Sequence, residues 1–294
     1  MDIIELIMQC AAVPSFSTFE DQLHPLIKSI VGTMSIASLE MVPDHNLIIT
    51  VPGNRKSPPI ALAAHLDKIN HFGLNFPTPI PVSRDSEGLE GLLDDAVGVG
   101  IGLGLMLESQ RRNFPPLLLL LSEVEENISR VPDRRLLRQN SHGLHSGIGA
   151  RRIAEYLLEQ NRVPSLVITL DTTPLFKGQR GLALYSRPWE FGSVSPGEEL
   201  VAATQAVEKY MQRIHPSIRI CNNTNDYVIY GTVLNSASSP PVPSLALEPA
   251  IYPYHQTNER VFLSDIENVI GVLRFFLETF PGVLGSARFA GHTH

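Results

Sequence analysis

The chain has 294 residues, of which 43% are hydrophobic and 18% charged, and its formal net charge is −7. This hydrophobic content suffices for a substantial core, whereas a negative charge without long runs of one sign excludes the basic surface that nucleic-acid binding requires. Because Cys10 and Cys221 are its only cysteines, the chain has no disulfide framework and no thiolate zinc site, so we expect it in the cytoplasm.

The N-terminal part of the chain predicts two helices. Apolar residues recur at helical spacing over Asp2 to Gln9 and again over Phe19 to Val31, and Ser17 or Thr18 can cap the second helix. The acidic start lacks the basic residues of a secretory signal. Because the longest apolar run, Pro115 to Leu121, is far shorter than the roughly 20 residues of a membrane span, we expect a soluble protein with no membrane partner.

A hairpin and then an alternating series of strands and helices follow. The expected strands are Ser38 to Val42, Asn46 to Val51, Ile60 to Ala64, Leu117 to Leu121, Leu166 to Leu170 and Ser244 to Leu247. The expected helices are Ala96 to Glu108, Gly149 to Glu159, Glu198 to Arg213 and Asp265 to Thr279. Such apolar strands between amphipathic helices predict an α/β fold with a mostly parallel, mixed sheet covered by helices on both faces.

The sequence predicts one domain rather than two. No internal repeat, low-complexity tract or long linker interrupts residues 1 to 284, which we expect to form a single domain. Residues 285 to 294 are small and polar, and we expect them to form a flexible tail.

Four glycines, at positions 98, 100, 102 and 104, fall in one predicted helix. Their spacing is not that of a dinucleotide-binding loop, which needs glycines at its first, third and sixth positions. Because a glycine in a helix costs roughly 0.5 to 1 kcal/mol relative to alanine, close packing of this helix on the sheet is the better explanation.

Residues that commonly ligate metals stand where predicted strands end or loops begin. His65, Glu126 and Asp171 each follow a strand, Asp94 precedes a helix, and His255 lies in the loop after the last strand. In open α/β sheets such loops converge at the carboxyl ends of the strands and bind ligands there. Two imidazoles and three carboxylates are the donors that a pair of Zn²⁺ or similar ions requires. We therefore predict two metal sites that share a carboxylate.

Three neighbouring acids fit supporting roles in such a centre. Asp67 can accept the second ring N–H of His65 and so fix its tautomer. Glu125 can act as general base on a metal-activated water. Asp95 can hydrogen-bond to the ligands without binding a metal itself. Singly, these acids have ordinary structural explanations, such as a helix cap for an aspartate or a solvated turn for a glutamate. The prediction depends on all of them occurring together.

The order His-x-Asp, Asp-Asp, Glu-Glu, Asp, His resembles that of the co-catalytic zinc exopeptidases, which include leucyl, glutamyl and deblocking aminopeptidases. The resemblance covers nearly the whole chain, and Leu-Asp-Asp-Ala-Val-Gly-Val-Gly at 93–100 is similar to the bridging-aspartate motif of the glutamyl and deblocking branch. It implies a zinc-exopeptidase-like fold, two metal ions bridged by Asp94, and a cis peptide bond between the two aspartates. It also implies that one ion is completed by His65 and Asp171, the other by Glu126 and His255, and that Glu125 is the base.

The number of residues between the predicted ligands indicates which branch of the family the chain resembles. The 29 positions from His65 to Asp94 leave no room for the domain that deblocking aminopeptidases insert there, and the 84 positions from Asp171 to His255 leave none for a carboxypeptidase lid. The chain therefore resembles a bare catalytic domain, which favours removal of N-terminal residues.

The segment Ile128 to Gly147 departs from the family pattern, in which the next helix begins close behind the two glutamates. It contains a cluster of basic residues: Arg130, Arg134, Arg135, Arg138, His142 and His145. These side chains could grip a peptide carboxylate, or the segment could be an ordinary solvated insertion.

Candidate substrate-binding residues are less specific than the ligands. Asp226 and Tyr227 lie where aminopeptidases carry a substrate loop, and Tyr254 lies beside a predicted ligand. The tyrosines could line a specificity pocket, although an aromatic side chain near a sheet belongs more often to the core.

These observations predict a dinuclear metal-dependent aminopeptidase that removes N-terminal residues from peptides by attack of a metal-activated water. Zinc is the expected ion, and cobalt or manganese suits the same ligands. An amidase, deacylase or N-terminal cyclase acting on small amides, or a homologue without turnover, would use the same fold. The expected partner is a peptide or small amide, and the sequence leaves the oligomeric state open.

Overall fold

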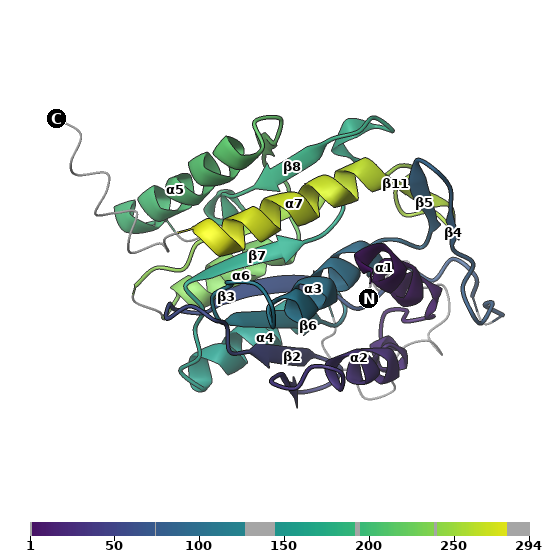
Figure 1. The fold of residues 1–294 in the computed structure, drawn as a ribbon, viewed down its shortest axis with the longest axis horizontal. Helices are drawn as coiled ribbons and strands as arrows, with labels where there is room; N and C mark the ends of the chain where they lie inside the picture. Colours follow the sequence, from purple (N-terminus) through teal and green to yellow (C-terminus); the bar gives the residue numbers. More distant parts are fainter. Residues whose placement is uncertain (1, 74, 127–144, 192–194, 238–239, 281–294) are drawn as a thin grey trace.

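The computed structural model describes residues 2–73, 75–126, 145–191, 195–237 and 240–280 (Figure 1). The predicted tail, 285–294, lies outside these residues, as does most of the predicted insertion, 128–144. In the described part of the chain, no helix is long and apolar enough to cross a membrane.

An eight-stranded sheet forms the centre of the molecule, with strand order β1-β2-β6-β3-β7-β10-β8-β9. The strands are β1 (Ser38–Met41), β2 (Leu47–Val51), β3 (Ile60–His65), β6 (Leu117–Ser122), β7 (Leu166–Leu170), β8 (Leu182–Tyr185), β9 (Arg219–Cys221) and β10 (Ser244–Pro249). The four central strands β6, β3, β7 and β10 are parallel, whereas β2 is antiparallel to both β1 and β6, and β8 is antiparallel to β10. The predicted α/β fold with a mostly parallel, mixed sheet is confirmed.

Helices cover both faces of this sheet (Figure 1). One face carries α1 (Ile3–Ala12), α2 (His24–Val31), α3 (Ala96–Glu108), α5 (Glu198–Ile214) and α7 (Leu263–Thr279), and the other carries α4 (Ile148–Glu159) and α6 (Asp226–Asn235). Successive side chains of a strand point to opposite faces, so Leu62 and Leu119 enter the first core, while Ala61 and Leu118 enter the second. Both faces of the central strands are therefore buried.

A second, three-stranded sheet was not predicted. It consists of β4 (Ser83–Arg84), β5 (Gly88–Gly91) and β11 (Glu259–Phe262), in the order β11-β5-β4. Because β5 precedes Asp94 and β11 follows His255, the pairing of these two strands brings both loops to the same place. Glu259 strengthens the connection, since its carboxylate accepts the N–H groups of Leu93 at 2.8 Å and of Asp94 at 3.1 Å.

The predicted helix over Phe19 to Val31 is wrong in its first turn. The segment forms a short 3-10 helix, Glu20–Gln22, and α2 begins only at His24. Pro25 explains the break, because a proline tolerates the first turn of a helix but not its interior. Ser17 and Thr18 do not cap α2, which has no side-chain cap.

The glycine-rich helix α3 packs closely on two sides. A Cβ atom at Gly102 would lie 2.5 Å from Leu119 of the sheet, as the sequence predicted, but one at Gly100 would lie 2.5 Å from Cγ1 and 2.7 Å from Cα of Ile7 in α1. The glycines therefore serve two interfaces, only one of which was expected.

Gly100→Ala is expected to destabilise the protein by about 1–3 kcal/mol, because the added methyl group meets the backbone of α1 and overpacks the core. Gly271→Ala in α7 is the matched control, since nothing lies within 4 Å of its Cβ position, and alanine there should stabilise by up to about 1 kcal/mol. Urea denaturation measures both changes. Equal stability of Gly100→Ala and wild type would contradict this account of the packing.

Candidate metal centre

The five predicted ligands meet at one edge of the central sheet. His65 is the last residue of β3, Glu126 follows β6, Asp171 follows β7, Asp94 lies between β5 and α3, and His255 lies between β10 and β11. The Nε2 atom of His65 lies 3.2 Å from Oδ1 of Asp94 and 3.8 Å from Oδ1 of Asp171. On the other side, Nε2 of His255 lies 3.4 Å from Oδ2 of Asp94 and 3.3 Å from Oε1 of Glu126.

These contacts divide the residues into two sets that share Asp94. His65, Asp94 and Asp171 form one set, and Asp94, Glu126 and His255 form the other; within each set the candidate ligand atoms lie within 4.8 Å of one another. The two oxygens of Asp94 face different histidines. A shared carboxylate flanked by two imidazole–carboxylate pairs fits two divalent cations.

The charges of the centre also suit cations. Asp94, Glu126 and Asp171 are all buried, and burial, reinforced by the negative charge of Asp94, raises the pKa of both Glu126 and Asp171. Burial alone would lower the pKa of His65, but hydrogen bonds to Asp171, Asp67 and Asp94 raise it well above its usual value. Buried carboxylates this close together are costly unless cations compensate them.

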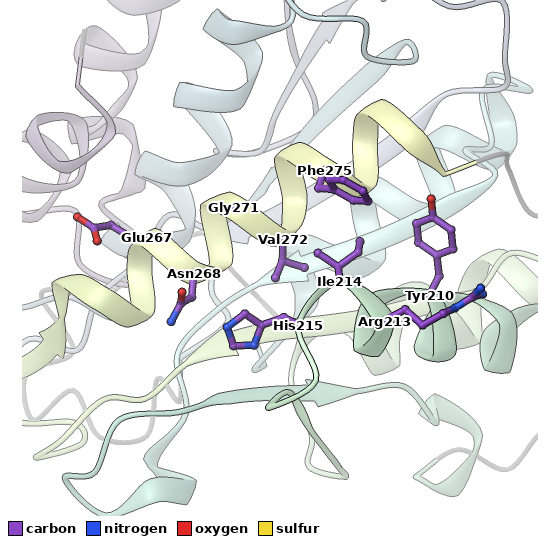
Figure 2. A pocket seen from close by; sticks show the side chains of 9 residues that line it. All are labelled: Tyr210, Arg213, Ile214, His215, Glu267, Asn268, Gly271, Val272 and Phe275. Atoms are coloured by element: carbon purple, nitrogen blue, oxygen red, sulfur yellow. The ribbon is translucent and has the colours of Figure 1, made fainter.

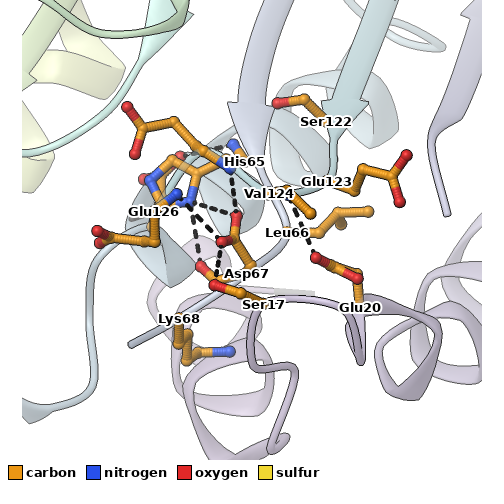
Figure 3. A network of polar contacts seen from close by, with 12 residues as sticks. Ser17, Glu20, His65, Leu66, Asp67, Lys68, Ser122, Glu123, Val124 and Glu126 are labelled. Atoms are coloured by element: carbon orange, nitrogen blue, oxygen red, sulfur yellow. Dashed lines mark hydrogen bonds and ion pairs between the residues drawn. The ribbon is translucent and has the colours of Figure 1, made fainter. Parts of the chain in front are cut away.

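Asp67 contacts both the ligand histidine and the turn that carries the two glutamates (Figure 3). The Nδ1 atom of His65 lies 3.3 Å from Oδ1 of Asp67 and 3.1 Å from its backbone oxygen. The carboxylate also accepts the N–H groups of Glu125 at 3.0 Å and of Glu126 at 3.1 Å, and the hydroxyl of Ser17 at 2.7 Å. The sequence suggested only the first of these contacts.

Asp95 connects a ligand to helix α3. Its side chain accepts the N–H of Gly98 at 2.7 Å, which makes it the N-cap of α3, and the N–H of His65 at 3.3 Å. The peptide bond between Asp94 and Asp95 is cis, as the family resemblance implied.

Glu125 lies beside the metal ligands but is not part of the two sets that share Asp94. It is half-buried, and with His65 and Glu126 it forms a further group whose candidate ligand atoms lie within 4.8 Å of one another and could hold an ion. Burial, together with the charges of Asp226 and Asp171, raises the pKa of Glu125 well above its usual value. A carboxylate beside the candidate ligands, with its pKa raised, can either bind an ion or exchange a proton with a nearby water.

The three candidate substrate residues differ in exposure and in the groups that they contact. Tyr254 is 37% exposed, stacks on His255 with ring centroids 3.6 Å apart, and lines a cavity of about 740 Å³ together with Tyr252. Tyr227 is fully buried and its hydroxyl donates to Asn222. Asp226 begins α6 and accepts the Ser122 hydroxyl at 2.6 Å, and burial raises its pKa to about 7.

Two further polar residues of the centre were not predicted. The side-chain amide of Asn225 donates to Asp171 at 2.9 Å and to Glu248 at 2.7 Å, and its oxygen caps α6. The asparagine-rich stretch before α6 was the only sequence signal for this contact, because Glu248 lies within a buried strand.

Another cavity, of about 550 Å³, lies between α5 and α7 (Figure 2). Tyr210, Ile214 and Phe275 are among its lining residues, and none of the five predicted ligands belongs to them. This cavity is therefore separate from the candidate metal centre.

No protein-family profile matches the sequence, and no curated protein does. Solved structures do share the fold. A TET aminopeptidase from a marine sediment archaeon of the Thaumarchaeota aligns with a TM-score of 0.68 at 12% identity, over 96% of this chain and 99% of that one. The aminopeptidase of the archaeon Desulfurococcus kamchatkensis aligns with a TM-score of 0.64 at 12% identity over 94% of both chains.

The aminopeptidase PepT of Bacillus cereus aligns with a TM-score of 0.62 at 11% identity, over 94% of this chain and 97% of that one. The chain thus has the fold of known aminopeptidases, and the fold that its motifs implied is confirmed.

Proposed function

We propose that the protein is a dinuclear metal-dependent aminopeptidase. The observation that carries the proposal is the position of Asp94, whose two oxygens face two different histidine–carboxylate pairs. The fold shared with several aminopeptidases supports it. Residues 1–284 would form the single catalytic domain.

Each residue of the centre has a defined part in this proposal. His65 and Asp171 would hold one ion, Glu126 and His255 would hold the other, and Asp94 would contribute to both sites. The ions supply Lewis acidity, which polarises a carbonyl and lowers the pKa of a water. Glu125 takes the proton from the attacking water and returns it to the leaving nitrogen, while Asp67 keeps the ring of His65 oriented.

The cavity beside His255 is the proposed position of the substrate side chain. Tyr254 and Tyr252 supply aromatic surface there, and Gln256 and Lys177 supply polar groups. Asp226 and Tyr227 contact neighbouring core residues rather than this cavity, so their part in substrate binding stays a prediction.

Zinc is the proposed native ion, because it is the most common ion at hydrolytic sites of imidazole and carboxylate donors, and cobalt or manganese suits the same ligands. The cytoplasm is the proposed location. Peptides are the proposed substrates, and although one of the structures with this fold is described as a dodecamer, we propose no oligomeric state for this chain.

Hydrolysis of a peptide panel tests the proposed function. Protein loaded with Zn²⁺, Co²⁺ or Mn²⁺ should release the first residue of uncapped peptides and should leave their N-acetylated forms intact, because an aminopeptidase needs a free amine. Mass spectrometry of the products measures this. Cleavage of capped substrates alone would indicate a deacylase or amidase, and no cleavage with any metal would contradict catalysis.

A further inference from the structure

The turn that carries Glu125 and Glu126 is held mainly by side chains; one backbone contact, from the N–H of Gly147 to the carbonyl oxygen of Val124 at 2.7 Å, is added from the start of α4. Four consecutive backbone N–H groups each donate to a side-chain oxygen: Glu123 to Asn46 at 2.9 Å, Val124 to Glu20 at 3.2 Å, Glu125 to Asp67 at 3.0 Å and Glu126 to Asp67 at 3.1 Å. Figure 3 shows Glu20 and Asp67 approaching the turn from the same side. All four of these N–H groups after β6 are therefore satisfied by three side chains that are distant in sequence.

Val124 has an unfavourable backbone conformation. Its φ angle is 51°, in the left-handed region, and its side chain is fully buried. A β-branched residue seldom adopts this conformation, so external contacts must hold it. Thr18 is also left-handed, with a φ angle of 74°, and its N–H donates to the same oxygen of Glu20 at 2.7 Å.

Hydrogen bonds to both of its carboxylate oxygens fix the side chain of Glu20. It is fully buried, and its second oxygen accepts from Nδ1 of His45 at 2.7 Å. The backbone N–H of His45 in turn donates to Glu123 at 3.1 Å, and its backbone oxygen accepts from His24 at 2.9 Å. The carboxylate of Glu20 thus joins the N-terminal segment, the β1–β2 hairpin and the turn after β6.

The group formed by Glu20, His45 and Glu123 is close enough to suggest a further metal site, but its hydrogen bonds indicate otherwise. Both oxygens of Glu20 already accept hydrogen bonds, and those of Glu123 accept from Asn46, His45 and Arg152. The group is a hydrogen-bonded network and not a metal site.

We propose that Glu20 is a positioning residue for the reaction. It holds Val124 in the left-handed conformation, so that Glu125 and Glu126 leave β6 in the direction of Asp94. Glu20 makes this contact through the N–H of Val124 and does not touch the substrate or the ions. The effect of Glu20 on catalysis rests on the proposed function, because it acts through Glu125. The effect of Glu20 on the conformation of the turn does not depend on that function.

Three variants test the proposal. Glu20→Ala removes both N–H contacts; Glu20→Gln keeps an oxygen that can accept both, and His45 can change its tautomer to match. Asp21→Asn, at the next and half-exposed position, removes the same charge and is the control, since in the described part of the chain the Asp21 carboxylate lies 3.8 Å from Nε2 of His45 and makes no hydrogen bond to the turn. Glu20→Ala is expected to lower kcat by about tenfold or more with KM nearly unchanged, because a small displacement of a catalytic group suffices for that, whereas Glu20→Gln and Asp21→Asn keep most of kcat.

Hydrogen exchange of the segment 122–126 gives a second readout that is independent of activity. In wild type the amides of Val124 to Glu126 should exchange slowly, although they lie beyond the end of β6. Glu20→Ala should accelerate their exchange, and Asp21→Asn should leave it unchanged. Fast exchange in wild type would overturn the proposal even if Glu20→Ala does not fold. An unchanged kcat in folded Glu20→Ala would also overturn it.

The two readouts distinguish failure of the proposal from failure of the proposed function. If wild type cleaves no peptide while Glu20→Ala still accelerates exchange, the aminopeptidase assignment is lost and the hold of Glu20 on the turn is supported. If wild type is active and the exchange of Glu20→Ala matches wild type, the positioning role is lost and the assignment stands.

Discussion

Replacement of Glu125 by glutamine is expected to lower kcat by about 10²–10⁴-fold, the usual contribution of a general base, with both ions still bound. The side chain does not belong to the two ligand sets that share Asp94, although it forms a further group with His65 and Glu126. Because both sets that share Asp94 stay complete in Glu125→Gln, the substitution should remove proton transfer and leave both ions bound. Glutamine keeps the size of the side chain and cannot accept the proton. Steady-state kinetics and elemental analysis of the same preparation measure the two properties.

Glu155→Gln is the matched control for this substitution. Glu155 is a glutamate of α4 that is 53% exposed, and its replacement should change neither kcat nor metal content. If Glu125→Gln kept full activity, or if it lost its ions together with its activity, Glu125 would not be the general base.

Replacement of Asp94 by alanine is expected to release both ions and abolish activity. Each oxygen of Asp94 belongs to a different ligand set, so its removal weakens both sites at once, whereas His255→Ala should weaken only one. Elemental analysis after dialysis should therefore give no ion for Asp94→Ala and one for His255→Ala. Both variants should retain the fold, because the ligands lie at the edge of the sheet.

Thermal unfolding provides an independent check of the same variant. An ion present at 100 times its dissociation constant stabilises the folded state by about 2.7 kcal/mol, so added metal should raise the Tm of wild type by several degrees and leave that of Asp94→Ala unchanged. Asp21→Ala, at a half-exposed position, should respond like wild type. Two ions retained by Asp94→Ala would refute the shared-carboxylate arrangement.

The convergence of the candidate ligands could be predicted because the signal of each is local. His65 and Asp171 each end a run of apolar residues, and parallel strands bring such positions to one edge of the sheet whatever the details of packing. The same reasoning placed Asp94, since a helix start beside the sheet is visible in the sequence.

The contacts that hold these ligands in place could not be predicted in the same way. Glu20 reaches Val124 across 104 positions, and Asn225 reaches Asp171 across 54. Nothing near Glu20 in the sequence marks it as buried, because an acidic residue before a helix is ordinarily solvated. Even the break before α2 was missed, although Pro25 was there to indicate it.

The strands β5 and β11 were also missed. They are short, and Gly88 and Gly91 interrupt the usual strand composition. Their pairing joins distant segments of the chain, and the accompanying hydrogen bond from Leu93 to Glu259 spans 166 positions. Sequence periodicity indicates which segments are regular, but it does not show which of them meet over such distances.

The pairing of β5 with β11 has a consequence for synthesis on the ribosome. A nascent chain that ends before residue 259 lacks both the strand that pairs with β5 and the carboxylate that holds the N–H groups of Leu93 and Asp94. The loop of Asp94 then lacks these contacts, although the central parallel strands are already translated. The part of the structure that brings Asp94 and His255 together is therefore incomplete until β11 has been synthesised.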